Sequence, residues 1–212
     1  MTGRDEPRRV EDWDRFSRTP SLGAHPAFIA ELFGGALSEE TAARIGRRPR
    51  FGERLSRMIA QRHGLAEIDA PADDADRAIA LASGEELDAL SRRAGAVCWA
   101  DPIAREIRAP DVAALKEALG DDAYAAALAN REEAFSPVTL GLGEPGAEAL
   151  GRDQLVARSR ASGRMCLAAW LTTQPRGVSD RVRLKLSPEA VLPQVDEAYL
   201  EYGPAIVRRV AA

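Results

Sequence analysis

The stretch Leu87-Asp-Ala-Leu-Ser-Arg-Arg-Ala-Gly-Ala-Val-Cys98 carries the most regular hydrophobic pattern in the chain. Its apolar residues recur at steps of three and four, which places them on one face of an α-helix. Asp101-Pro102 then opens a second helical segment, Ala109-Pro110 separates it from a third, and Gly120 ends the third. We therefore predict a succession of short packed helices, with nothing in this stretch arranged for catalysis.

The rest of the sequence predicts further helices and one short strand. Val182, Leu184 and Leu186 alternate with basic residues, a period of two that is typical of a half-buried strand with a basic outer face. We expect a mainly α fold, a single multi-helix globular domain over residues 15–212, with a small β element at residues 181–186. The charged segment 1–14 is expected to be disordered.

Composition narrows the classes of protein to consider. The chain has 212 residues, 45% of them hydrophobic, and a formal net charge of −4, which argues against a dedicated nucleic-acid-binding domain. Cys98 and Cys166 lie among apolar residues, so buried free thiols are favoured over a disulfide. No signal peptide opens the chain and no apolar run is long enough to span a bilayer. These features favour a cytoplasmic protein.

Each candidate catalytic or cofactor-binding motif lacks a part that its chemistry requires. Gly141-Leu-Gly-Glu-Pro-Gly146 matches the dinucleotide-binding pattern literally, but the segment before it contains Pro137 and no acidic residue stands at the required distance after it. His25 and His63 are the only histidines, and neither has the spacing of a metal site. The sequence therefore predicts no catalytic residues, no cofactor and no metal.

The densest basic segment is a candidate partner-binding site. Of the basic residues only Lys116 and Lys185 are lysines, an arginine bias that is read first as a coding preference. The segment is an interrupted helical pattern with six arginines, Arg44, Arg47, Arg48, Arg50, Arg54 and Arg57. They predict either a solvated face with ion pairs to Glu40 and Glu53, or a docking site for an acidic protein surface, or, less favoured, for nucleic acid or anionic lipid.

Several segments resemble one known family. Leu90-Ser-Arg-Arg-Ala-Gly-Ala-Val-Cys-Trp-Ala100, Ile103-Ala-Arg-Glu-Ile107 and Val112-Ala-Ala-Leu-Lys-Glu-Ala-Leu-Gly120 are similar to the SctK (YscK) family of the bacterial type III secretion injectisome. His25-Pro-Ala27 with Leu32-Phe-Gly34, and Cys166-Leu-Ala-Ala-Trp170 with Arg181-Val-Arg-Leu-Lys-Leu186, also resemble it. The likeness covers most of residues 17–186.

The resemblance implies a mainly helical, non-enzymatic protein-transport adaptor in the sorting platform beneath the injectisome. Such an adaptor would link the SctQ pod to the cytoplasmic domain of the inner-membrane ring protein SctD, and would reach the membrane only through these partners. The family has no catalytic residues to transfer. The alternative that the sequence leaves open is an arginine-mediated nucleic-acid-binding helical regulatory domain.

Overall fold

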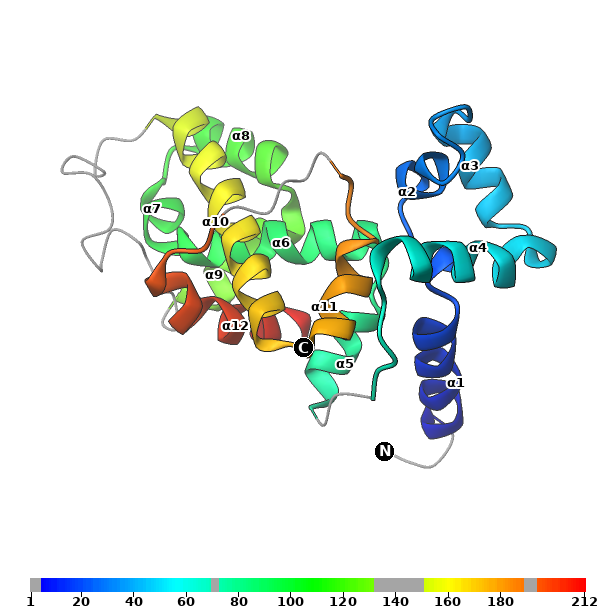
Figure 1. Ribbon diagram of the computed structural model, residues 1–212. Helices are drawn as coiled ribbons and strands as arrows, with labels where there is room; N and C mark the ends of the chain where they lie inside the picture. Colours follow the sequence, from blue (N-terminus) through cyan, green and yellow to red (C-terminus); the bar gives the residue numbers. More distant parts are fainter. Residues whose placement is uncertain (1–4, 70–72, 132–150, 189–193) are drawn as a thin grey trace. The chain divides into compact units, whose positions relative to one another are not determined.

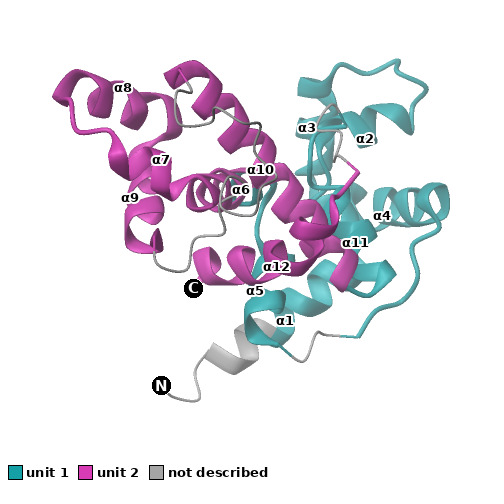
Figure 2. Cartoon of the chain, turned by 90° about the vertical axis from the view of Figure 1, so that its left-hand side faces the viewer, with its two compact units in different colours: residues 1–87, 174–191 teal, residues 88–173, 192–212 magenta. Residues whose placement is uncertain are grey.

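The computed structural model describes residues 5–69, 73–131, 151–188 and 194–212, and all regular structure in these ranges is helical (Figure 1). The mainly α class is thus confirmed. The helices form two compact units, one from residues 1–87 and 174–191 (unit 1) and one from residues 88–173 and 192–212 (unit 2) (Figure 2). That residues 15–212 fold as one domain stays a prediction.

Unit 1 contains seven described helical elements and the first turn of an eighth. They are α1 (Asp5–Arg18), the 3₁₀ helix η1 (Pro20–Leu22), α2 (Pro26–Glu31), α3 (Glu39–Gly46), α4 (Pro49–His63), α5 (Asp74–Leu81), α11 (Arg176–Arg183) and the start of α6 (Gly84–Cys98).

The first helix occupies part of the segment that was expected to be disordered. α1 includes most of residues 1–14. Its second half is stabilised by pairs one helical turn apart, Arg15 with Asp12 at 3.3 Å and Arg18 with Asp14 at 2.7 Å. Buried Trp13 and Phe16 anchor it, with ring centroids 5.0 Å apart.

Helices α2, α3 and α4 enclose an apolar cluster within unit 1. The cluster is formed by Ile29, Ala30, Ala42, Leu55, Ile59 and Leu184. Local signals set the helix ends: Ser38 accepts a hydrogen bond from the backbone N–H of Thr41 at the start of α3, and Gly64, in the left-handed conformation, ends α4. Serine before a helix and glycine after one are the residue types that favour these positions, so both ends carry a local sequence signal.

The strand predicted at residues 181–186 is wrong. Residues 176–183 form helix α11, and a turn follows. The alternating pattern places Arg181 and Lys185 on an outer basic face, whereas in the structure they are only 7% and 8% exposed. Together with buried Val178 and Val182 they complete a helical i, i+3, i+4, i+7 pattern that points inward.

The two buried cations bind the carboxyl ends of other helices in unit 1. The Arg181 guanidinium donates to the carbonyl oxygens of Ser17, Ala66 and Gly177 at 2.7–3.2 Å. The Lys185 ammonium donates to the carbonyl oxygens of Ala80 and Ala82, both at 2.7 Å. Ser17 lies in the last turn of α1, and Ala80 and Ala82 lie at the end of α5. The negative ends of these two helix dipoles therefore compensate the buried charges.

Unit 2 consists of the rest of α6 with α7 (Ala100–Arg105), α8 (Ala109–Leu119), α9 (Asp121–Ala129), α10 (Arg152–Thr173) and α12 (Glu197–Ala211). Helix α10 packs most extensively against α12. It also meets α6 at two glycines: a methyl group on Gly95 would overlap with the carbonyl oxygen of Ser159, and one on Gly163 with that of Ser91. The backbones of α6 and α10 can approach this closely only because both positions are glycine.

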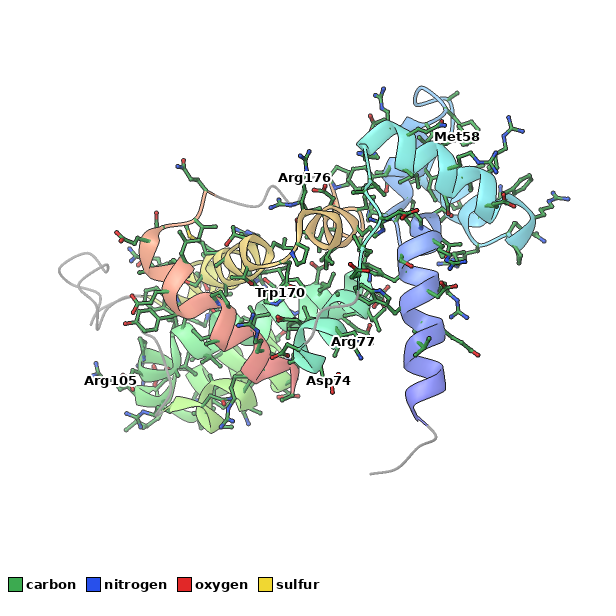
Figure 3. All side chains as sticks on the ribbon, turned by 60° about the horizontal axis from the view of Figure 1, so that its bottom comes forward. Met58, Asp74, Arg77, Arg105, Trp170 and Arg176 are labelled. Atoms are coloured by element: carbon green, nitrogen blue, oxygen red, sulfur yellow. The ribbon has the colours of Figure 1, made fainter. Side chains whose placement is uncertain are left out.

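The interior of unit 2 holds buried tryptophan side chains and a chain of hydrogen bonds between polar side-chain atoms. Trp170, in α10, is completely buried (Figure 3). The Trp99 indole N–H donates to Ser162 Oγ at 2.9 Å, and Ser162 Oγ lies 2.7 Å from Tyr199 Oη in α12. No helix among the described residues has the length and apolar character needed to cross a membrane.

An exposed arginine surface on helices α3 and α4

All six arginines of the basic segment are exposed on unit 1. Arg44 lies in the last turn of α3, Arg47 and Arg48 form the link to the next helix, and Arg50, Arg54 and Arg57 lie on α4. We call this set the arginine surface. The sequence predicted its members, and the structure places them on two consecutive helices of one compact unit and on the link between these helices.

The periodicity of α4 explains why its arginines face solvent. Arg50, Arg54 and Arg57 recur at i, i+4 and i+7 and therefore share one face. Leu55 and Ile59, which are 3% and 0% exposed, lie on the opposite face and belong to the apolar cluster. Burial of that cluster fixes the rotation of α4 about its axis and so keeps the three arginines outward.

Little in the described residues neutralises the arginine surface. Arg57 forms one ion pair, with Glu53 at 2.8 Å, and the Arg50 guanidinium stacks over the Phe51 ring at 4.6 Å. The remaining four arginines make no ion pair with any described residue, and the ion pair expected with Glu40 is not formed. Exposed guanidinium groups are hydrated and need no ion pair, so the solvated-face and docking interpretations both stay open.

The start of α4 runs against the usual charge preference of a helix. Arg48 occupies the N-cap position, but its guanidinium accepts no capping hydrogen bond, and Arg50 lies in the first turn, which has no acidic residue. The N-terminus of a helix carries partial positive charge, so a cation there is unfavourable by about 0.3–1 kcal/mol. Arg44, by contrast, lies at the favourable carboxyl end of α3. Arg48 and Arg50 are therefore the members whose presence helix stability does not explain.

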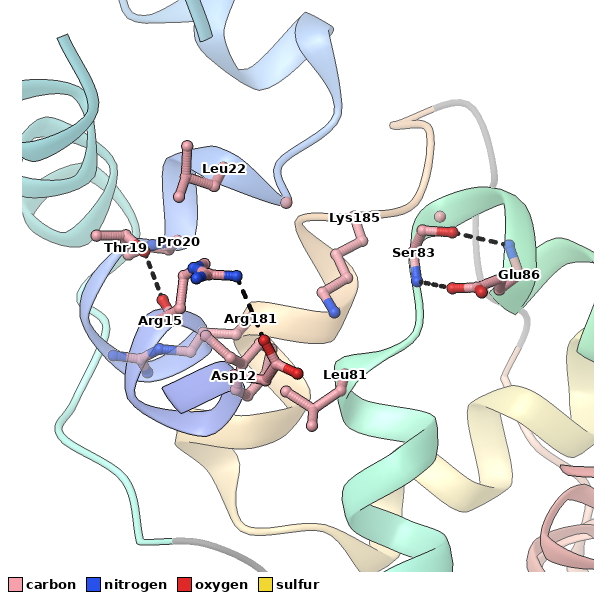
Figure 4. A pocket seen from close by; sticks show the side chains of 13 residues that line it. Asp12, Arg15, Thr19, Pro20, Leu22, Leu81, Ser83, Glu86, Arg181 and Lys185 are labelled. Atoms are coloured by element: carbon pink, nitrogen blue, oxygen red, sulfur yellow. Dashed lines mark hydrogen bonds and ion pairs between the residues drawn. The ribbon is translucent and has the colours of Figure 1, made fainter. Parts of the chain in front are cut away.

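A cavity of about 460 Å³ in unit 1 was not predicted from the sequence (Figure 4). Lys185 lines it, and burial lowers the pKa of this ammonium to about 8, while the nearby Glu86 carboxylate opposes the shift. Arg181 also lines it, and burial lowers its pKa as well. Both cations already donate to backbone carbonyls, so we assign them a structural role.

Two residues that line the cavity, Ser83 and Glu86, form a capping box, a helix-start motif that can be recognised in the sequence. Ser83 and Glu86 match the S-x-x-E pattern. The backbone N–H of Ser83 donates to Glu86 Oε2 at 2.7 Å, and the backbone N–H of Glu86 donates to Ser83 Oγ at 3.2 Å. The hydrogen bond from the Ser83 backbone N–H lowers the pKa of the Glu86 carboxyl. Ser83 and Glu86 therefore cap the N-terminus of α6.

The histidines have structural positions. His25 caps α2, its Nδ1 accepting from the backbone N–H of Ala27 at 3.3 Å. His63 ends α4 and packs edge-on against Phe28, with ring centroids 5.5 Å apart. Within the described ranges, no group of three or more potential ligand side chains is placed to hold a metal ion. Residues 141–146, the glycine pattern, lie outside the described residues.

Comparisons with protein-family models, with curated proteins and with solved structures find no match for this chain. The resemblance to the SctK family therefore rests on the sequence segments quoted above, and the arginine surface is the site from which a function can be argued.

Proposed function

We propose that this protein is a non-enzymatic cytoplasmic adaptor that binds an acidic protein surface through its arginine surface. The observation that carries the proposal is the pair Arg48 and Arg50 at the positive end of α4, where cations oppose helix stability and find no carboxylate among the described residues. Guanidinium groups form charge-assisted, bidentate hydrogen bonds with carboxylates. An acidic partner would supply the carboxylates that this part of the chain lacks.

The type III secretion sorting platform is the setting that the sequence resemblance favours. In that setting the chain links a SctQ-type pod protein to the cytoplasmic domain of a SctD-type ring protein, and the arginine surface contacts one of the two. An adaptor requires two separate binding surfaces and no chemical step.

Affinity capture from the native host tests this function. Tagged protein is recovered at moderate salt, with and without nuclease, and its partners are identified by mass spectrometry. We expect pod or ring components of the injectisome to be recovered in both conditions. Recovery of nucleic-acid-associated proteins alone, lost after nuclease treatment, would contradict the proposal and support the nucleic-acid-binding alternative.

A charge-reversal triple variant then tests the site itself. Arg47→Glu, Arg48→Glu and Arg50→Glu together should weaken one pairwise complex by at least about tenfold, because each reversal replaces attraction with repulsion. Arg92, Arg105 and Arg164 are exposed arginines of unit 2. Their reversal to Glu changes the net charge equally and should leave that complex intact. Equal loss with both variants would show a general charge effect and remove the site assignment.

A further inference from the structure

Two buried thiols lie in contact within unit 2. Cys98 is the last residue of α6 and Cys166 lies in α10. Their Sγ atoms are 3.5 Å apart, and neither residue has any exposed surface. The sequence predicted two separate buried thiols; it did not indicate that residues so far apart in the chain would meet.

The surroundings hold the two sulfur atoms side by side. Gly95 and Gly163 bring the backbones of α6 and α10 together close to the thiols. Next to Cys98, the Trp99 indole is hydrogen-bonded to Ser162 of α10 at 2.9 Å. A second helix, α12, packs on the same part of α10 through Gly203, whose added methyl group would lie 3.1 Å from the Cα of Cys166. The contact between the thiols is therefore part of the packing of three helices.

We propose that Cys98 and Cys166 form a dithiol oxidation site, at which a peroxide produces an intramolecular disulfide that joins α6 to α10. One thiol attacks hydrogen peroxide, breaks its O–O bond and becomes a sulfenic acid, with release of one water. The second sulfur then attacks the sulfenic sulfur, the S–S bond forms, and the hydroxyl leaves as a second water with the proton of that thiol. Two thiols lose two hydrogens, and one peroxide becomes two waters.

The geometry sets both the feasibility and the speed of this reaction. The sulfur atoms must approach by about 1.5 Å to reach bonding distance. The thiolate is the reactive form. Contact with Cys166 and burial raise the pKa of the Cys98 thiol, so thiolate is scarce. We expect oxidation to be slow at neutral pH and faster at higher pH. This inference is independent of the adaptor function.

The test uses the full chain, reduced, freed of reductant and treated with hydrogen peroxide. The protein is then unfolded, free thiols are alkylated, and intact mass and peptides are measured. We expect both thiols to be lost together, with a mass decrease of two hydrogen atoms and a cross-linked peptide pair containing Cys98 and Cys166. The disulfide closes a long loop, so the oxidised form should melt about 5–10 °C higher.

Single variants provide the matched controls. Cys98→Ser and Cys166→Ser should each retain one thiol, show no mass decrease of two hydrogens and gain no thermal stability with peroxide. The wild-type measurement decides the matter even where a variant folds poorly. Two thiols that remain open to alkylation, oxygen added to each sulfur separately, or disulfides formed only between molecules would each overturn the proposal.

Discussion

Arg181 and Lys185 show how a single residue can be buried with its charge intact. Buried cations are rare unless they are paired, and neither residue has an ion pair among the described residues. Each is placed against the carbonyl groups that end a helix, α1 for Arg181 and α5 for Lys185. The cations in turn satisfy carbonyls that a helix end leaves without a partner.

At Arg181 we predict a large loss of stability. Arg181→Met leaves the carbonyl oxygens of Ser17 and Ala66 without their buried donor, so the free energy of unfolding should fall by about 2–4 kcal/mol. The neighbouring Arg183 is exposed, and Arg183→Met should change the free energy of unfolding by less than about 0.5 kcal/mol. Urea titrations of the two variants measure the difference. Equal effects would contradict the role assigned to Arg181.

At Lys185 we predict a specific pH dependence of stability. Its folded pKa, about 8, lies below the ordinary value of 10.5, so between these values the unfolded chain binds more protons than the folded one. Stability from this group therefore rises with pH through that window and is flat below it. The raised pKa of Cys98 acts in the opposite direction above its ordinary value, so the wild-type profile alone does not isolate Lys185.

The variant Lys185→Met isolates the contribution, because it leaves Cys98 unchanged. Between about pH 7.5 and pH 9.5 the wild type should gain about 2 kcal/mol of unfolding free energy relative to the variant. Urea titrations at the two pH values give this double difference. Parallel pH profiles would show that Lys185 titrates normally in the folded state.

At the scale of helices, some ends could be predicted because their signals are local, whereas α7 begins at Ala100, before the predicted start at Asp101-Pro102. Ser38, Gly64 and Gly120 mark helix ends in the sequence and do so in the structure. Helix α11 could not be predicted in this way, because the inward orientation of Arg181 and Lys185 depends on carbonyls supplied by α1 and α5. The alternation that suggested a strand is part of a helical pattern in which Arg181 and Lys185 face inward and not toward solvent.

The N-terminus of α4 allows stability and binding to be separated. Arg48 has the extended backbone of an N-cap residue but no capping hydrogen bond. Arg48→Asp supplies an acceptor and a favourable charge, so the free energy of unfolding should rise by about 1 kcal/mol while partner binding weakens. Thermal unfolding and a binding titration of one sample measure both. Greater stability with unchanged binding would remove Arg48 from the arginine surface.

The crossing of α6 and α10 predicts a steep penalty for added volume. Gly163→Ala places a methyl group against the Ser91 carbonyl, so it should destabilise the protein by about 3 kcal/mol or more. Gly52 lies inside α4 with no atom within 4 Å of an added methyl group. Gly52→Ala should therefore be neutral or stabilising by up to about 1 kcal/mol. Chemical unfolding of both variants tests the contrast; a tolerated Gly163→Ala would contradict the close approach.

At the scale of the whole molecule, the sequence could predict the helical class and the members of the arginine surface, because both follow from local patterns. It could not predict the division into two units, the cavity beside Lys185 or the contact between Cys98 and Cys166. Each of these depends on which distant segments meet. The identity of an acidic partner likewise depends on the surface of that partner, which lies outside this sequence.

The most direct measurement is binding by the intact protein to each of its two proposed partners, a SctQ-type pod protein and the cytoplasmic domain of a SctD-type ring protein. Calorimetric titrations would compare the wild type, the variant with Arg47, Arg48 and Arg50 reversed to Glu, and the unit 2 control. We predict that the wild type binds both partners and that the triple variant loses at least about tenfold in affinity for one and none for the other. Unchanged affinity of the triple variant for both partners would contradict it.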